Sequence, residues 1–288
     1  RLTDVTGVQT CALPIWATHS DKGKITICRR SIEIFATWKE LYGDDIGWIQ
    51  NGYSFPAYTD QDEKKLKDLI KIQKSFDLNI DWLSPEDYEK LVPGINRHNL
   101  KGATYSPEDG SASPLLAVNA FYFKSLAYGA RYRFREQVQG IDIAGNDEIM
   151  VRTDKGKYTA GKVINAAGNF ARNIGRMIGL DLPVEPDSHE GGITEPVQRF
   201  FGPMIVDLRP AHDPATADSA NFYFYQNNEG QVIFCLTPKP LIQGTDSEAT
   251  SVFLPQVAKR MVDLFPKLAN LKVRDRKSTR LNSSHVSQ

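Results

Sequence analysis

The run from Lys162 to Gly168 (KVINAAG), together with the segment that follows it, constrains the fold most. Two apolar residues, Val163 and Ile164, lead into Ala166, Ala167 and Gly168, and a helical pattern fills residues 169–179. This order predicts a strand over residues 162–166, a tight turn and then a helix, as in an α/β fold. Small side chains let a cofactor's phosphate or ribose approach the backbone, and the helix N-terminus offers free N–H donors. Ordinary α/β domains that bind nothing at such a turn share the pattern.

The rest of the chain alternates between helical and extended patterns. Apolar residues at spacings of three and four predict helices over residues 25–42, 60–76, 85–92, 115–129 and 251–264. Short alternating runs predict strands over residues 130–134, 138–143, 149–153, 157–159, 189–194, 204–207, 221–225 and 231–236. The sequence therefore predicts an α/β chain with α+β elements: a Rossmann-type part and an antiparallel sheet after residue 183.

Charge and cysteine content narrow the classes of function. Lys plus Arg equals Asp plus Glu at 35 each, so no net charge draws the chain to nucleic acid. No apolar run approaches the roughly 18 residues of a membrane helix, so we expect no transmembrane segment. The three cysteines, Cys11, Cys28 and Cys235, show no metal-binding spacing, so we expect no metal and a reducing cytoplasm.

VINAAG at residues 163–168, with the helix and GLDLPVEP after it, resembles the second dinucleotide-contacting strand of the FAD-dependent amine and amino-acid oxidoreductases. That family includes glycine oxidase, D-amino-acid dehydrogenase and the sarcosine oxidase β subunit. PEDGSASP at residues 107–114 is similar to its PEDGSADP, with Ser113 where Asp is usual. GGITEP and GPMIVDLRP resemble the sheet that covers the flavin. The resemblance implies an FAD cofactor and covers residues 16–274.

The resemblance also implies cofactor contacts. Val138 matches the position where the family's backbone grips the adenine, and Ala166, Ala167 and Gly168 match the turn beside the cofactor. The polar side chains within the range 108–111 are expected to cap turns and the start of the next helix. The alternative is that they contact a ligand.

Two tyrosines are implied to face the substrate. Tyr53 and Tyr225 lie in segments that edge the pocket in relatives, whereas the alternative is that both are core tyrosines. Relatives often carry Arg where this chain has Tyr225, and such an Arg can bind a carboxylate in a bidentate pair. Arg199 and Lys239 are candidates to supply that cation instead. The alternative is that both are ordinary surface residues.

Both ends of the chain depart from the family. No G-x-G-x-x-G phosphate-binding turn occurs in the sequence. Residues 1–15 and 275–288 match no expected element, and we expect them to be artefactual, translated from sequencing adapters. The native part is then a fragment. A partial FAD-binding domain is expected at residues 16–45 and 107–182, and a substrate domain at residues 46–106 and 183–274.

Three functions stay open from the sequence. The first is oxidation of the C–N bond of a small amine or amino acid by hydride transfer to flavin, in a parent enzyme of which this chain is an inactive piece. The second is a related flavoprotein, either a hydroxy-acid dehydrogenase or a subunit that passes electrons to a partner. The third is a non-catalytic binding protein derived from a flavoenzyme.

Overall fold

The computed structural model describes residues 13–144, 148–209, 220–237, 242–243 and 253–283. The chain divides into two compact units. Unit 1 comprises residues 1–124, 190–240 and 248–277, and unit 2 comprises residues 125–189, 241–247 and 278–288. The expected mixture of helices and sheets is confirmed, whereas the boundaries expected for the two domains stay a prediction.

The helices of unit 1 begin and end at the residues that their caps predict. Helix α1 (Lys22–Tyr42) starts where the Asp21 side chain accepts a hydrogen bond from Lys24 N, and it ends at Gly43, whose φ is 81°. Helices α2 (Asp60–Lys74) and α3 (Pro85–Leu91) start at Thr59 and Ser84, whose hydroxyls accept from the third residue along. Helix α4 (Pro114–Ala127) packs Ala117 and Ala120 in one cluster with Trp38 of α1. Local capping chemistry therefore sets these ends.

A large sheet forms the centre of unit 1. Its strands are β2 (Tyr53–Ala57), β3 (Asp81–Leu83), β4 (Gly102–Ser106), β9 (Glu185–Pro196), β10 (Met204–Asp207), β11 (Ala220–Gln226) and β12 (Gln231–Thr237). They lie in the order β9-β12-β11-β10-β2-β4-β3. All neighbours are antiparallel except β10 and β2, which run parallel. Strand β14 (Val273–Ser283) also pairs with β9, although the sequence indicates no element after residue 274.

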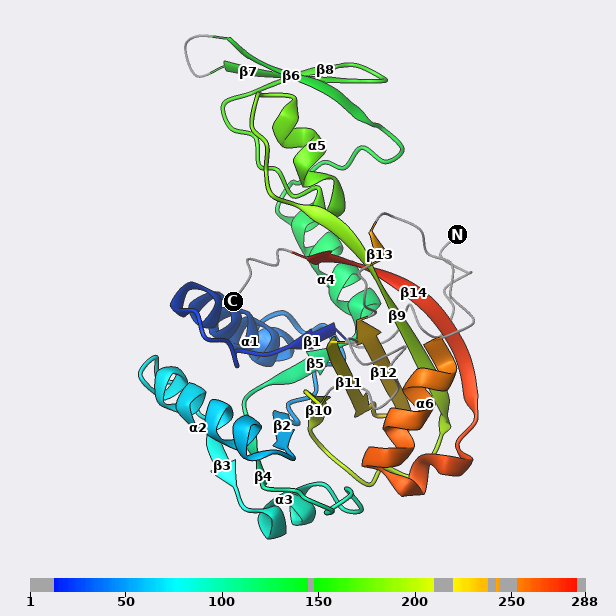
Figure 1. Ribbon diagram of the computed structural model, residues 1–288. Helices are drawn as coiled ribbons and strands as arrows, with labels where there is room; N and C mark the ends of the chain where they lie inside the picture. The colour runs from blue at the N-terminus through cyan, green and yellow to red at the C-terminus, as the bar shows by residue number, and fades with distance from the viewer. Residues whose placement is uncertain (1–12, 145–147, 210–219, 238–241, 244–252, 284–288) are drawn as a thin grey trace. The chain divides into compact units, whose positions relative to one another are not determined.

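The sheet has two buried faces because alternate residues of a strand point to opposite sides. On β11, Phe222 and Phe224 belong to the main hydrophobic core, whereas Tyr223 and Tyr225 belong to a separate cluster. The main core is covered by α3, by α6 (Phe253–Leu264) and by the 3₁₀ helix Pro266–Asn270. Figure 1 shows α6 beside β12, a strand that it contacts.

Helix α6 is also tied to the sheet by a buried ion network. Asp207, at the end of β10, is 1% exposed. Its carboxylate lies 3.0 Å from Arg209 Nε and 3.2 Å from Arg260 Nη2 of α6. The Arg209 guanidinium also lies 4.1 Å from the centroid of the Tyr58 ring. Arg209 also lies 2.9 Å from the Asp263 carboxylate of α6, so the buried charge of Asp207 is balanced within a network of two arginines and two aspartates.

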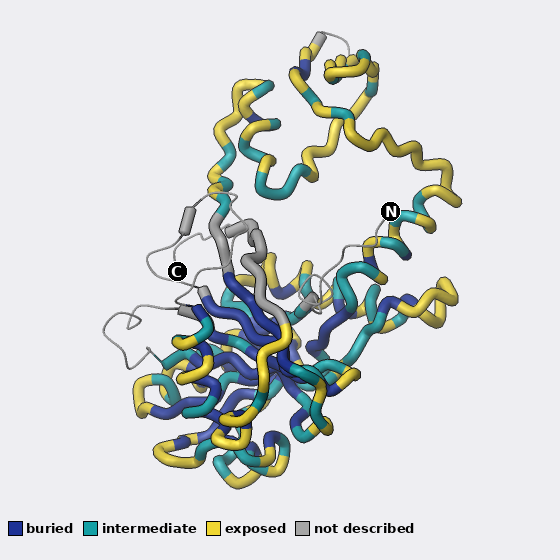
Figure 2. The backbone as a smooth tube through the Cα atoms, turned by 90° about the vertical axis from the view of Figure 1, so that its right-hand side faces the viewer, coloured by how far each residue is buried: buried dark blue, intermediate teal, exposed yellow. Residues whose placement is uncertain are grey.

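Unit 2 carries a three-stranded antiparallel sheet of β6 (Val138–Ala144), β7 (Glu148–Thr153) and β8 (Lys157–Ala160), in that order. Helix α5 (Ala171–Arg176) follows the 3₁₀ turn Gly168–Phe170. The two-residue strand β13 (Ile242–Gln243) pairs with residues 187–188 of β9. Figure 2 shows the strands of unit 1 as buried, whereas residues of unit 2 are mostly exposed or intermediate.

Two predicted strands of this unit are wrong. Residues 162–167 form no strand, because no described strand pairs with them, and Ile164 is 88% exposed. An apolar run cannot act as a strand without a hydrogen-bonded neighbour. Residues 130–134 likewise pair with no strand among the described residues, and the next residue, Arg135, has a φ of 55°, outside the extended region.

No helix in the described part of the chain is long and apolar enough to span a bilayer.

The main core makes a stability prediction. Phe224 is fully buried and contacts the rings of Phe201 and Phe265. We expect Phe224→Ala to lower the free energy of unfolding by about 3–5 kcal/mol through lost burial and a cavity. The matched control is Phe123→Ala on α4, which is 64% exposed and should cost less than about 1 kcal/mol. Urea unfolding followed by circular dichroism checks both, and equal losses would contradict the assigned core.

Candidate functional site

The segment after strand β1 (Leu13–Ile15) brings Trp16 onto the sheet. Strand β1 pairs with β5 (Gly110–Ala112), so that Ile15 lies opposite Gly110. One residue later, the Trp16 ring stacks on the Tyr53 ring, with centroids 5.1 Å apart and planes 17° apart. Ala17 N then donates a 2.9 Å hydrogen bond to Asp109 Oδ1. Strand pairing and one side-chain hydrogen bond therefore fix Trp16 from both sides.

The face of the sheet away from α6 is here called the aromatic face. Its buried members and the partly buried side chains packed on them are Tyr53, Ile193, Met204, Val206, Tyr225 and Ile233, with Trp16, Phe55, Leu208 and Tyr223. The structure thus brings the two predicted substrate-facing residues, Tyr53 and Tyr225, into one cluster. Each is 4% exposed. Their contact with a substrate stays a prediction.

Hydroxyl and thiol groups of the aromatic face stay protonated. Burial, and then the charges of Asp109 and Cys235, raise the pKa of Tyr53 well above its ordinary value. Tyr223 and Cys235 are cross-strand partners. Burial raises the pKa of the Cys235 thiol to about 11, against a hydrogen bond with Tyr223 that lowers it. These groups can give or accept hydrogen bonds at neutral pH, but they are not ionised nucleophiles.

Asp109 is the buried acid beside this face. Its backbone carbonyl accepts from Gly52 N at 2.8 Å, next to Tyr53, and its Oδ1 accepts from Ala17 N. Oδ2 has no well-oriented hydrogen-bond partner among the described residues, although the Ser106 hydroxyl lies beside the carboxyl group. Burial raises the pKa of Asp109 to about 7, against the Ala17 and Ser106 hydrogen bonds, which lower it. Asp109 therefore changes charge near neutral pH.

A pocket of about 560 Å³ opens beside Asp109. Its walls come from α1, from the segment after α2 and from the β4–β5 turn, and Glu108 and Asp109 lie on the turn side. Exposed residues of α1, among them Arg30 and Glu33, form its rim. We call it the Asp109 pocket.

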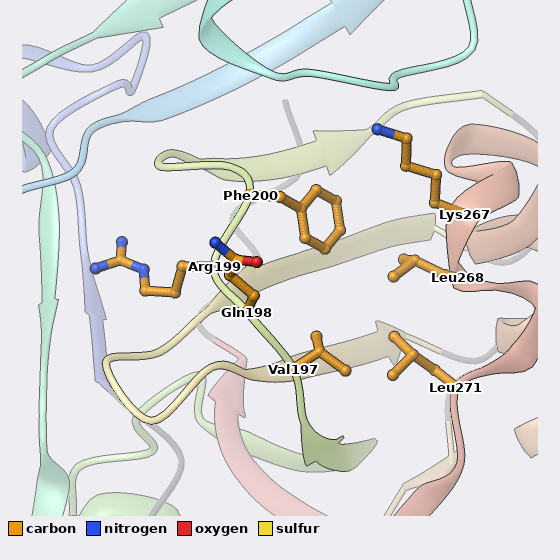
Figure 3. Close-up of a pocket in the computed structure, with 7 residues that line it drawn as sticks. All are labelled: Val197, Gln198, Arg199, Phe200, Lys267, Leu268 and Leu271. Atoms are coloured by element: carbon orange, nitrogen blue, oxygen red, sulfur yellow. The ribbon is translucent and has the colours of Figure 1, made fainter.

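A second pocket, of about 450 Å³, lies on the other side of the sheet. It is lined by the loop from Val197 to Phe200 and by Lys267, Leu268 and Leu271, and both Phe200 and Leu271 pack on the main core (Figure 3). Arg199, a candidate for binding a carboxylate, lies here and donates to Asn228 Oδ1 at 3.3 Å. It therefore does not belong to the aromatic face. Lys239, the other candidate, lies outside the described residues.

The predicted turn residues Ala166, Ala167 and Gly168 lie in unit 2. Asn165 organises the turn, because its Oδ1 accepts from Ala167 N at 3.2 Å and its Nδ2 donates to Ala171 O at 2.8 Å. Gly168 has a φ of 55°, a conformation that favours glycine. The backbone here is accessible, so the small side chains leave room for a ligand. The cofactor contact stays a prediction.

Val138, the predicted adenine contact, begins strand β6 at the edge of the small sheet. The backbone of the preceding residue, Gln137, bonds to Asp154 through both its N–H and its carbonyl. Because peptide groups of a strand alternate in direction, the backbone of Val138 faces away from β7. That orientation suits a backbone contact with a base.

Sequence reasoning missed Trp16, Tyr223 and Cys235, and it treated Asp109 as a turn cap. The alternation of Phe and Tyr over residues 222–225 was a usable signal for Tyr223. Nothing local marks Trp16 or Asp109, because their roles depend on contacts between distant residues: Ala17 bonds to Asp109, 92 positions away, and Trp16 stacks on Tyr53.

Comparison with known proteins decides the family. The model of the family described as FAD dependent oxidoreductase matches residues 11–280. The chain belongs to this family. Its predicted resemblance, and the FAD dependence of the family, are therefore confirmed.

Three similar proteins illustrate the relationship. Mouse mitochondrial sarcosine dehydrogenase is 28% identical over 204 residues, which is 69% of this chain and 22% of that protein. Sarcosine oxidase subunit beta of an Arthrobacter species is 24% identical over 212 residues, or 72% of this chain and 50% of that subunit. The crystal structure of L-proline dehydrogenase from P. horikoshii has a TM-score of 0.85 and 29% identity, covering 98% of this chain and 73% of that one. The chain thus spans half or less of the length of the two curated relatives.

The described residues fit FAD in two separate places. In unit 2, the accessible turn at Gly168 and the outward-facing backbone of Val138 suit the dinucleotide part. In unit 1, the aromatic face offers stacked rings and protonated hydroxyls, which suit a flat aromatic ring system.

The raised pKa of Asp109 predicts how stability depends on pH. In the folded chain this pKa is about 7, above the ordinary 3.8, so the folded state binds the proton more tightly than the unfolded state. The free energy of unfolding should therefore fall, through this group, as pH rises from about 4 to 7. We expect Asp109→Asn to remove that fall. Urea unfolding of both proteins at intervals between pH 4 and pH 8 measures it, and parallel curves would contradict the assignment.

Proposed function

We propose that the parent protein is an FAD-dependent oxidoreductase that oxidises the C–N bond of a small amine or amino acid. The observation that carries this proposal is the aromatic face: a cluster of stacked rings and protonated hydroxyls, in a chain of the FAD-dependent family. The similarity to sarcosine dehydrogenase and L-proline dehydrogenase supports an amine or amino-acid substrate.

The chain's own residues would bind and orient the substrate. When bound, flavin supplies the acceptor for the hydride that leaves the carbon next to nitrogen. The apolar walls of the aromatic face exclude water and disfavour an ammonium ion, so the neutral amine is the form that fits there. The hydroxyls of Tyr53 and Tyr223, kept protonated by burial, can hydrogen-bond the substrate without taking its charge.

The residues that define the aromatic face are aromatic and aliphatic, so none of them supplies a cation for a substrate carboxylate. Tyr225 is a hydrogen-bonding group and not a charge, and Arg199 lines the pocket on the other side of the sheet. This favours amines whose recognition does not depend on a bidentate arginine.

The partner and the compartment are also proposals. The similarity to a protein named subunit beta supports a partner subunit that receives the electrons. Cys28 and Cys235 are unpaired thiols, which supports a reducing compartment such as the cytoplasm. The mouse relative, by its name, is mitochondrial.

The chain as given should not hold FAD firmly, and we expect it to be inactive. The phosphate-binding G-x-G-x-x-G turn does not occur in the sequence. Gel filtration after incubation with FAD, followed by absorbance near the flavin band, measures retention. A stoichiometric yellow chromophore on the purified chain would contradict this prediction.

The substrate class is tested in the parent protein, expressed with its native flanking sequence. Under anaerobic conditions, we expect bleaching of the flavin absorbance by sarcosine, L-proline or glycine. Lactate and glycerol 3-phosphate are the matched controls without nitrogen. Bleaching by these controls alone would replace the amine proposal with the hydroxy-acid alternative, and no flavin in the parent would leave the non-catalytic alternative.

A further inference from the structure

The buried carboxyl group of Asp109 connects the Asp109 pocket with the aromatic face. On one side it forms the floor of the pocket, whose rim is made of exposed residues. On the other side Oδ1 accepts from Ala17 N, the residue directly after Trp16. The side chain itself is 0% exposed. A titratable group thus lies between solvent and the stacked pair of Trp16 and Tyr53.

The two protonation states of Asp109 hold Ala17 differently. An ionised carboxylate accepts the N–H of Ala17 in a charge-assisted hydrogen bond, which is shorter and stronger than a neutral one. A protonated carboxyl group accepts the N–H of Ala17 more weakly. The Ser106 hydroxyl beside the carboxyl group lowers the pKa of Asp109, so it favours the ionised form. Protonation therefore weakens the hold of Asp109 on Ala17.

We propose that Asp109 is a positioning residue of the aromatic face: by exchanging a proton with solvent through the Asp109 pocket, it sets how Trp16 stacks on Tyr53. Its use in catalysis rests on the proposed function, because the stacked pair is part of the surface assigned there to flavin and amine. In that setting the geometry of the site follows pH over the range in which the acid titrates. Asp109 touches no substrate in this arrangement, since Ala17 and Trp16 carry its effect.

Other titratable and charged groups surround Asp109. Those from the elements packed around it are Glu108 in the same turn, Tyr53 on β2, Cys28, Arg29, Arg30 and Glu33 on α1, and His19 after β1. Burial raises the pKa of both Cys28 and Tyr53 above their ordinary values, so neither titrates near neutral pH. His19 is the real competitor, since its ring lies 5.9 Å from that of Trp16. Burial and Lys24 lower its pKa from 6.5.

The test follows Trp16 directly and needs neither flavin nor substrate. The full chain is labelled with 5-fluorotryptophan, and the resonance of Trp16 is assigned by its loss in Trp16→Phe. We expect its chemical shift to titrate with a midpoint near pH 7, the pKa of Asp109. Asp109→Asn should abolish the titration, whereas Glu108→Gln, the charge-matched control in the same turn, should keep it. His19→Gln should keep it as well.

A second variant guards against misfolding of Asp109→Asn. The resonances of Trp38, Trp48 and Trp82 report whether that variant is folded. Ser106→Ala removes the hydroxyl that lowers the pKa of Asp109, so the Trp16 midpoint should move to higher pH. A resonance that does not titrate in the native chain, a titration that survives in folded Asp109→Asn, or one lost in His19→Gln overturns the proposal. Failure of amine oxidation in the parent would leave this titration intact, so the two proposals fail separately.

Discussion

The alternation of side chains along the central strands is the constraint on which the rest of unit 1 depends. Each of β10, β11 and β12 sends one set of residues to the core under α6 and the other to the aromatic face. Phe222 and Phe224 cannot leave the core without also moving Tyr223 and Tyr225. A one-residue slip in register would exchange the two sets, so stability of the core specifies the composition of the site.

The aromatic face also depends on a segment far away in the chain. Trp16 reaches it because β1 pairs with β5 and because Asp109 holds Ala17. A carboxyl group buried without a cation is costly, and its raised pKa expresses that cost. Acids of this kind are frequent at functional sites, where a change of protonation near neutral pH has a use. The strength of the hydrogen bond between Asp109 and Ala17 therefore depends on pH.

The sequence was sufficient where the controlling chemistry is local. Helices predicted over residues 25–42 and 85–92 are observed as α1 (Lys22–Tyr42) and α3 (Pro85–Leu91), and the predicted strand over residues 204–207 has the same bounds as β10. The sequence did not predict the structure correctly where strand pairing determines it. The run around Ile164 has the composition of a strand, but no described strand pairs with it. Part of the candidate site could be predicted from the sequence. The family resemblance pointed to the two tyrosines as candidates, whereas the role of Asp109 depends on its burial, which no short window of sequence reveals.

The ion network at Asp207 restricts the order in which its residues can be substituted without loss of stability. One carboxylate serves two arginines, Arg209 and Arg260, so the three positions are not equivalent. Loss of either arginine leaves Asp207 paired with the other, whereas loss of Asp207 removes the buried carboxylate that both arginines share and leaves Arg209 only the partly exposed Asp263, 2.9 Å away. Exchange of the network for apolar residues must therefore begin at the arginines and reach the aspartate last. Whether a stable apolar variant can be reached at this end of β10 therefore depends on the order of the substitutions as well as on their number.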